Sequence, residues 1–123
     1  MNIIKSQDVT HIDKPEGTSV SYYLFNDYEV HYNIQAPKTT QTWHHHEHIS
    51  ETLYIIDGQL TAKWRENKSE KSVVVSAGDL IETEDSSHTF SNDTDKITRF
   101  IVIKRVSDGK DYRNVFKTDK VLD

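Results

Sequence analysis

The chain has 123 residues, carries 15 Lys and Arg against 20 Asp and Glu, and has a formal net charge of -5 and no cysteine. Its length accommodates one hydrophobic core, so residues 1–123 are expected to form a single domain. The lack of cysteine excludes a disulfide framework and a thiolate metal site, and the dispersal of both signs of charge argues against a surface that binds nucleic-acid phosphates.

The N-terminal segment, Met1 to Asp8, lacks the continuous apolar run of a signal peptide. No later stretch approaches the roughly 18 apolar residues that would span a bilayer. We therefore expect a soluble, cytoplasmic protein that does not bind a membrane. The residues before about Ser19 are expected to form a peripheral strand or arm of the domain.

Side chains that favour β-structure dominate the chain. Thr, Val and Ile number 33, whereas Ala and Leu, which favour helices, number only 8. Turn residues such as Asp57-Gly58 separate short extended runs, and several short strands at close spacing are typical of a sandwich or barrel. The predicted strands are Ser19–Phe25, Glu29–Gln35, Thr52–Asp57, Gln59–Arg65, Ser72–Val75, Asp79–Thr83, Thr89–Ser91 and Ile97–Val106. Only Gly109–Thr118, after the capable N-cap Asp108, is a candidate for a short C-terminal helix.

Four of the seven histidines lie within one run of five residues. On a strand, side chains alternate between faces, so His44 and His46 point to one side and can share one ion. His45 and His48 cannot both join them without a bend. The helical alternative is set aside, because Ser50 stands where the metalloprotease pattern H-E-x-x-H requires its second histidine.

Two later residues complete a candidate ligand set. Glu51 begins an alternating run, and an adjacent antiparallel strand would bring it beside the two imidazoles. His88 follows a turn and a further strand, from where it can return across the same barrel mouth. Three neutral imidazoles and one carboxylate suit Mn, Fe, Co, Ni, Cu or Zn and leave one or two positions open. The alternative is a solvated, histidine-rich surface loop with incidental affinity for nickel or zinc.

The residues around the cluster match a known motif. The first motif of the cupin superfamily reads G-x5-H-x-H-x(3,4)-E-x6-G, and the chain resembles it at His44, His46, Glu51 and Gly58. Lys38 takes the place of the leading glycine, a departure that concerns the conformation of one turn. We assign Gly58 to a turn as well.

The second cupin motif, G-x5-P-x-G-x2-H-x3-N, is matched at Gly78, His88 and Asn92. Glu84 and Ser86 replace its Pro and its second Gly, and the spacing before the histidine is one residue short. The loop before His88 is therefore expected to be built differently. We assign Gly78 to a turn and Asn92 to a structural hydrogen bond.

The resemblance to the cupin superfamily implies a fold, a ligand set and a cofactor. The fold would be a six-stranded double-stranded β-helix, or jelly-roll barrel, with one divalent transition metal inside and the two motifs at about residues 38–92. The implied metal ligands are His44, His46, Glu51 and His88.

Four large aromatic residues and two charged residues are further candidates for lining a pocket. Large aromatics usually serve cores first, so packing in the barrel is preferred to a substrate platform for Tyr32, Trp43, Tyr54 and Trp64. Glu82 and Arg99 lie in predicted strands, where such charges more often face solvent than a cavity.

The leading functional hypothesis is a small-molecule enzyme whose metal polarises a substrate oxygen or activates dioxygen or water. An isomerase, epimerase, decarboxylase or dioxygenase would each suit such a site, and no general base can be assigned near the metal from the sequence. The alternatives are a non-catalytic small-ligand-binding or sensing protein and a metal-independent protein similar to sugar-nucleotide ketoisomerases. Many cupins of this size pair through their sheets, so a homodimer is expected.

Overall fold

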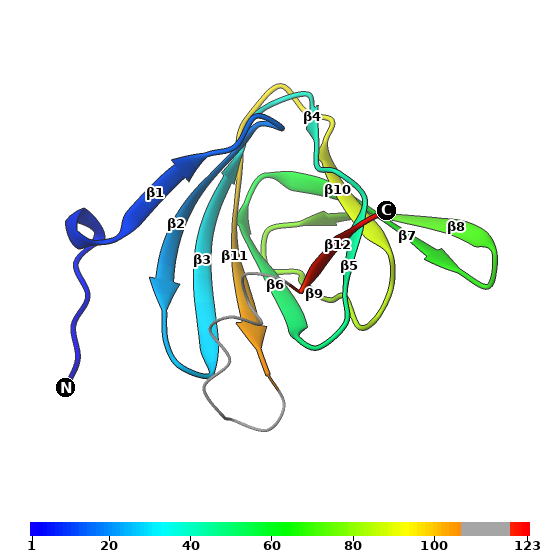
Figure 1. Ribbon diagram of the computed structural model, residues 1–123. Coiled ribbons are helices and arrows are strands. Elements are labelled where there is room, and N and C mark those ends of the chain that lie inside the picture. The colour runs from blue at the N-terminus through cyan, green and yellow to red at the C-terminus, as the bar shows by residue number, and fades with distance from the viewer. Residues whose placement is uncertain (107–118) are drawn as a thin grey trace.

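The computed structural model describes residues 1–106 and 119–123 (Figure 1). The helix predicted at Gly109–Thr118 lies outside these described residues. Within them, the chain forms β-strands and one short 3-10 helix, η1 (Ser6–Asp8). No helix in the part of the chain that the structure describes is long and apolar enough to cross a bilayer.

Two antiparallel sheets form the two layers of a barrel (Figure 1). The first sheet has the spatial order β1 (Thr10–Asp13), β2 (Thr18–Leu24), β3 (Tyr28–Gln35), β11 (Thr98–Arg105), β6 (Ser50–Asp57) and β9 (Leu80–Glu82). The second sheet has the order β12 (Lys120–Leu122), β5 (His44–His46), β10 (His88–Asn92), β7 (Gln59–Glu66) and β8 (Ser69–Ser76), and β4 (Thr39–Thr40) pairs with β10. The prediction of an all-β jelly-roll fold is confirmed.

The strands predicted from β-forming runs are all present, with ends that shift by at most three residues. The expected N-terminal strand is β1, which forms the exposed edge of the first sheet and, among the described strands, pairs with β2 alone. The short strand β12 was not predicted. Its three residues carry no periodic signal, and its pairing with β5 is a contact between distant parts of the chain.

Alternation along the strands produces the hydrophobic core. On β11, Phe100 and Val102 face inward, and their register partners on β6 are Ile55 and Leu53. Full burial of each such side chain contributes about 1.5–3 kcal/mol. The core cluster consists of Leu53, Ile55, Leu60, Ala62, Val75, Phe90, Phe100 and Val102, with Ile81 packed against it.

The prediction that four aromatic residues pack in the barrel is wrong for the two tyrosines. Tyr54 is 46% exposed, and both it and Tyr32 lie on the outer face of the first sheet, because both pair with Ile101 in register. Trp43 and Trp64 are half-buried and lie outside the core cluster. Two phenylalanines fill the core instead.

The turn predicted at Gly58 joins β6 to β7 and needs a glycine. Its φ is +84°, a conformation that L side chains rarely adopt. A Cβ atom at this position would lie 2.6 Å from Oγ1 of Thr98. Gly78, between β8 and β9, also has a positive φ, of +92°.

Candidate metal centre

The histidine run forms β5, and its side chains alternate as the sequence predicts. His44 and His46 point into the barrel and are 4% and 3% exposed. His45 points to the other face, where its Nδ1 lies 2.9 Å from the Asp123 carboxylate, a contact that raises the pKa of His45. His48 lies beyond the strand and is exposed. The prediction that His44 and His46 share one face is confirmed.

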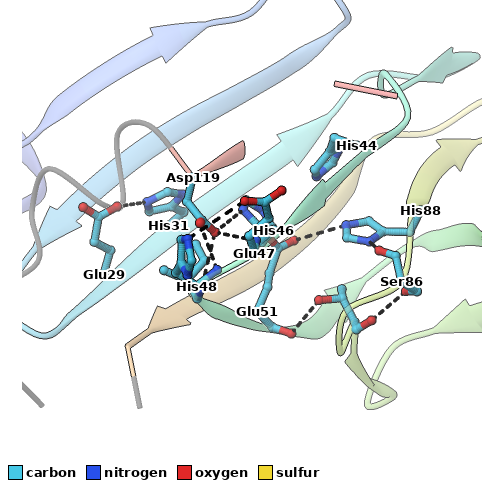
Figure 2. A network of polar contacts seen from close by, with 12 residues as sticks. Glu29, His31, His44, His46, Glu47, His48, Glu51, Ser86, His88 and Asp119 are labelled. Carbon is cyan, nitrogen blue, oxygen red and sulfur yellow. Dashed lines mark hydrogen bonds and ion pairs between the residues drawn. The ribbon is translucent and has the colours of Figure 1, made fainter. Parts of the chain in front are cut away.

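Glu51 reaches the same point from the facing sheet (Figure 2). It lies near the start of β6, and the alternation of that strand buries its carboxylate together with Leu53. Its Oε2 lies 2.7 Å from Nε2 of His46. One donor atom from each of His44, His46 and Glu51 can be chosen so that all three lie within 4.8 Å of one another, close enough to hold a single cation.

His88, the first residue of β10, lies beside this cluster but outside the group of three residues whose donor atoms lie within 4.8 Å of one another. It is the register partner of His44, and the two ring centroids lie 4.5 Å apart. Its Nε2 lies 4.0 Å from Oε1 of Glu51 (Figure 2). The structure therefore brings together all four residues that the sequence indicated as ligands.

Several nitrogen atoms in this cluster have no hydrogen-bond partner among the described residues. These buried atoms are Nε2 of His88 and both ring nitrogens of His46, which lack a hydrogen bond of good geometry even though Nε2 of His46 lies 2.7 Å from Oε2 of Glu51. Buried polar atoms are nearly always satisfied in proteins, so their concentration here needs an explanation. A bound cation would provide one, because it takes up the lone pair of an imidazole nitrogen.

Backbone carbonyls orient two of the rings. Nδ1 of His44 donates to the carbonyl oxygen of Thr42 at 2.8 Å, and Nδ1 of His88 donates to that of Ser86 at the same distance. A carbonyl can only accept, so each ring carries its proton on Nδ1 and has a lone pair on Nε2. This tautomer is the one that a metal-binding histidine requires when Nε2 is the ligand.

Asp119 holds the segment between the two parts of the cluster, and sequence analysis did not identify it. Its carboxylate accepts hydrogen bonds from the backbone N–H groups of Glu47, His48 and Ile49, at 3.0, 2.9 and 3.3 Å. Its Oδ2 also lies 3.6 Å from Nδ1 of His46. Asp119 therefore fixes the turn that leads from β5 to Glu51.

The protonation states favour a cation. Burial lowers the pKa of His44 to about 4 and also lowers the pKa of His88, so both rings are neutral near pH 7. Burial alone would raise the pKa of Glu51, but its contact with His46 and the charge of Lys104 outweigh that effect and lower it. Neutral imidazoles around an ionised carboxylate form a donor set for a divalent transition metal.

A small chamber opens beside the cluster. Its volume is about 40 Å³, and His44 and Glu51 line it together with His31 and Asn33 of β3. The inward face of β3 is entirely polar and buried, and consists of Glu29, His31, Asn33 and Gln35. Sequence analysis missed these residues, although their period-two spacing on a predicted strand was a readable signal.

Within this polar face, Glu29 and His31 form a pair. Nε2 of His31 lies 2.8 Å from Oε1 of Glu29 (Figure 2). The ring of Tyr22 packs edge-on against His31, with the centroids 4.7 Å apart. Burial lowers the pKa of His31, although its hydrogen bond to Glu29 acts in the opposite direction.

The charged strand residues Glu82 and Arg99 are exposed, as the sequence analysis preferred. Glu82 accepts a hydrogen bond from Oγ1 of Thr52 at 3.2 Å. Arg99 lies 3.7 Å from the carboxylate of Asp57. Neither lines the small chamber beside the cluster, but Glu82 lines a second cavity, of about 580 Å³, that His88 also lines.

The sequence of the chain matches a known protein family. A model of the cupin domain matches residues 31–104, which is more than half of the 123 residues. The chain belongs to the cupin family. No curated protein is similar to this cupin in sequence at a significant level.

Solved structures share the fold of this cupin at low sequence identity. A variant of the oxalate decarboxylase of Bacillus subtilis matches with a TM-score of 0.76 and 14% identity, over 97% of this chain and 31% of that chain. An uncharacterized conserved protein with a double-stranded β-helix domain from Klebsiella pneumoniae matches with 0.69 and 17%, over 89% and 93%. A recombinant oxalate oxidase in complex with glycolate matches with 0.68 and 17%, over 85% and 59%. The cupin spans about a third of the length of the oxalate decarboxylase.

The places where this cupin departs from the family motifs have local explanations. Lys38 has a φ of +56°, so it adopts the left-handed conformation that the glycine of the first motif would favour. Glu84 also has a positive φ, of +53°, in the loop whose Ser86 carbonyl orients His88. Asn92 makes the structural hydrogen bonds that were predicted, since its Nδ2 donates to the carbonyls of Gln35 and Lys96.

Proposed function

We propose that this cupin is a metal-dependent small-molecule enzyme. The metal would be held by His44, His46, Glu51 and His88. One observation carries the proposal: buried ring nitrogens of His46 and His88, which lack a hydrogen bond of good geometry among the described residues, lie 2.7 and 4.0 Å from the ionised, buried carboxylate of Glu51. When bound there, a divalent Fe, Mn, Ni, Zn, Co or Cu ion supplies Lewis-acid chemistry at a substrate oxygen, or redox chemistry if the metal is redox-active.

The pair Glu29 and His31 supports catalysis rather than binding alone. The ring of His31 lines the chamber, and its Nε2 proton faces Glu29, which leaves a lone pair on Nδ1. Among the described residues, the one side-chain hydrogen bond of the His31 ring is that of Nε2 to Glu29. His31 can therefore take a proton from a C–H or O–H group of a substrate, while Glu29 stabilises the charge that develops on the ring.

The metal site and the candidate base together are compatible with several classes of reaction. A Lewis acid and a base on one small chamber suit isomerisation, epimerisation, decarboxylation or ring-opening oxygenation. Structural relatives named as oxalate decarboxylase and oxalate oxidase are consistent with a small-molecule substrate.

Elemental analysis of the purified protein tests the metal site. We expect about one transition metal ion per chain in the wild type, and loss of that metal in His46→Ala and His88→Ala. The exposed His48 and the outward-facing His45 supply matched controls, because their replacement by Ala should leave the metal content unchanged. Equal loss from all four variants would indicate a loose surface chelate and contradict the proposal.

A substrate screen tests the base. Glu29→Gln and His31→Gln should bind metal like the wild type but lose about 10²–10⁴-fold in turnover. Unchanged turnover in both variants would remove His31 from the mechanism and leave the metal site intact.

One observation favours a second candidate, a metal-independent enzyme similar to sugar-nucleotide ketoisomerases. Tyr22 packs against His31, which lines the chamber, so a tyrosine and a histidine that such an enzyme would use as acid and base are in contact. Metal content separates the two candidates, since this alternative predicts full activity after treatment with a chelator. A non-catalytic binding protein predicts metal or ligand binding with no turnover.

We also propose a homodimer formed through the outer face of the first sheet. Consecutive register partners place one row of apolar and aromatic side chains across four strands of this face: Tyr32, Ile101, Tyr54 and Leu80. Tyr54 and Leu80 are 46% and 59% exposed. Light scattering should give the mass of a dimer for the wild type and of a monomer for Tyr54→Glu, whereas a wild-type monomer would exclude the proposal.

A further inference from the structure

Three lysine side chains line the same chamber as the candidate metal centre. Lys14 comes from the turn between β1 and β2, Lys104 from the end of β11 and Lys120 from the start of β12. Segments distant in the sequence thus bring three positive charges to one opening. His44 and Glu51 line the same space.

The register places two of these lysines next to groups of the site. Lys104 is paired with Glu51 on one side and with Glu29 on the other, and it shares their inward face. Lys120 is paired with His46. Because cross-strand partners share a face of their sheet, both lysine side chains project from the face that carries the candidate metal cluster and Glu29.

The carboxylates near the opening have partners of their own. Oε2 of Glu16 accepts hydrogen bonds from the backbone N–H and the hydroxyl of Thr42, at 3.0 and 3.3 Å. Glu29 contacts His31, and Glu51 contacts His46. Among the described residues, none of the three lysines forms an ion pair within 4.0 Å, whereas Lys38 lies 3.8 Å from Asp95.

The lysine charges also oppose one another. Burial lowers the pKa of Lys120, and the charges of Lys14 and Lys104 lower it further, while the charges of Glu16 and Glu51 act in the opposite direction. A bound divalent metal would add two more positive charges to the chamber. An anion bound between the lysines and the metal cluster would relieve this repulsion.

We propose that the chamber binds a small carboxylate anion, with the carboxylate held by Lys14, Lys104 and Lys120 on the side of the chamber that faces solvent. The inference rests on the proposed function, because it names the substrate class of the same site. The chamber volume of about 40 Å³ limits the size of the anion. A single water needs roughly 10–15 Å³ on this scale, so the inner space holds a group of only a few non-hydrogen atoms.

Calorimetric titration of the zinc-loaded protein tests the proposal. The probes are glycolate, formate, acetate and malonate, and glycolamide serves as a neutral counterpart that matches glycolate in size. We expect at least one carboxylate to bind, glycolate to bind at least about 10-fold more tightly than glycolamide, and carboxylate affinity to fall with added salt. Tighter binding of inorganic phosphate than of every carboxylate would overturn the assignment of the anion class.

Lysine variants localise the binding. Lys104→Gln and Lys120→Gln should each weaken carboxylate binding by about 10-fold or more, and Lys104→Arg should retain most of the affinity. Lys71→Gln, on the exposed strand β8, is the matched control and should bind like the wild type. Equal affinity of all these variants would overturn the inference.

The design separates this inference from the proposed function. If the wild-type protein does not bind zinc, the metal centre is rejected. The metal-free protein is then titrated with the same probes. A carboxylate preference that depends on Lys104 in the metal-free protein would still support the anion site. Zinc binding with no carboxylate binding would reject the anion site and leave the metal centre standing.

Discussion

The same strands carry both the candidate metal centre and the hydrophobic core, and only a step of two residues separates them. On β6, Glu51 faces the cluster, whereas Leu53 faces the core. On β10, the step is from His88 to Phe90, and both side chains are 2% exposed. The period-two alternation of the strand keeps both members of each pair inside the barrel.

This comparison shows how a cupin can place charged groups in its interior. We call the core cluster around Leu53 and Phe90 the apolar half of the barrel interior, and the candidate metal centre with the inward face of β3 the polar half. The side chains of the apolar half stabilise the barrel by packing against one another. The polar half contains groups that cost free energy when they are buried, and each needs a hydrogen bond, an ion or a ligand. Stability is therefore expected to come from one half of the barrel and function from the other.

The largest expected effect on stability distinguishes the apolar half from the polar half within one strand, β10. Phe90→Ala should lower the free energy of unfolding by about 3–5 kcal/mol, because it leaves a cavity in the core. His88→Ala should cost the metal-free protein less, because it removes a ring whose Nε2 has no hydrogen-bond partner among residues 1–106 and 119–123. Urea unfolding of both variants in chelator measures the difference. A larger loss for His88→Ala would contradict the division between the halves.

Asp119→Ala should give the next largest effect on stability, because Asp119 ties the segment between β5 and β6 to the start of the C-terminal strand. Three backbone N–H groups would lose their acceptor, and we expect a loss of about 2–4 kcal/mol. Metal affinity should fall by roughly 10–100-fold, as for other residues that orient ligands. Thermal unfolding with and without zinc measures both effects, and Asp119→Asn, which keeps one acceptor oxygen, should lose less.

Sequence patterns could predict the apolar half and the ligand set, for different reasons. Alternating apolar residues such as Leu53 and Ile55 identify strands and their buried face directly. His44, His46 and Glu51 were recognisable because their spacing matches a family motif. The predicted ligand role of these residues and of His88 is supported by their convergence and stays a prediction until a metal is measured.

The remaining parts of the site depend on pairings between distant segments. Asp119 and Lys120 enter the site only because β12 pairs with β5, and no local pattern indicates that pairing. His31 lies on a correctly predicted strand, but its role depends on Glu29 and on the chamber that it lines. The incorrect prediction that Tyr54 packs inside the barrel has the same origin. An aromatic residue in a strand does not indicate which face of the sheet other parts of the chain will cover.

Acidification should weaken the polar half before the apolar half. The pKa of His44 is 6.5 when unfolded and about 4 when folded, so the unfolded chain takes up the proton first as the pH falls. The stability associated with neutral His44 is complete above about pH 6.5 and is lost between pH 6.5 and 4, by up to about 3 kcal/mol. His31 and His88 act in the same direction, because burial lowers the pKa of each.

Urea unfolding of the metal-free protein at pH 7.5 and pH 4.5 measures this loss. His44→Asn should show a smaller decrease in stability between the two pH values. His48→Ala, which changes an exposed ring, should behave like the wild type. A wild-type stability that is the same at both pH values would show that the buried histidines titrate normally.

The smallest expected effect lies in the turn between β6 and β7. Gly58→Ala places a Cβ atom against Thr98 at a φ of +84°, and we expect a loss of about 1–2 kcal/mol from the backbone conformation. Oγ1 of Thr98 accepts from the N–H of Gln59 and donates to its carbonyl, so the strain falls on the turn that begins β7. This turn follows the apolar residues of β6, at the opposite end of the strand from Glu51. Zinc affinity should therefore be unchanged while the unfolding midpoint falls, and a change in both would mean that the two ends of β6 are coupled.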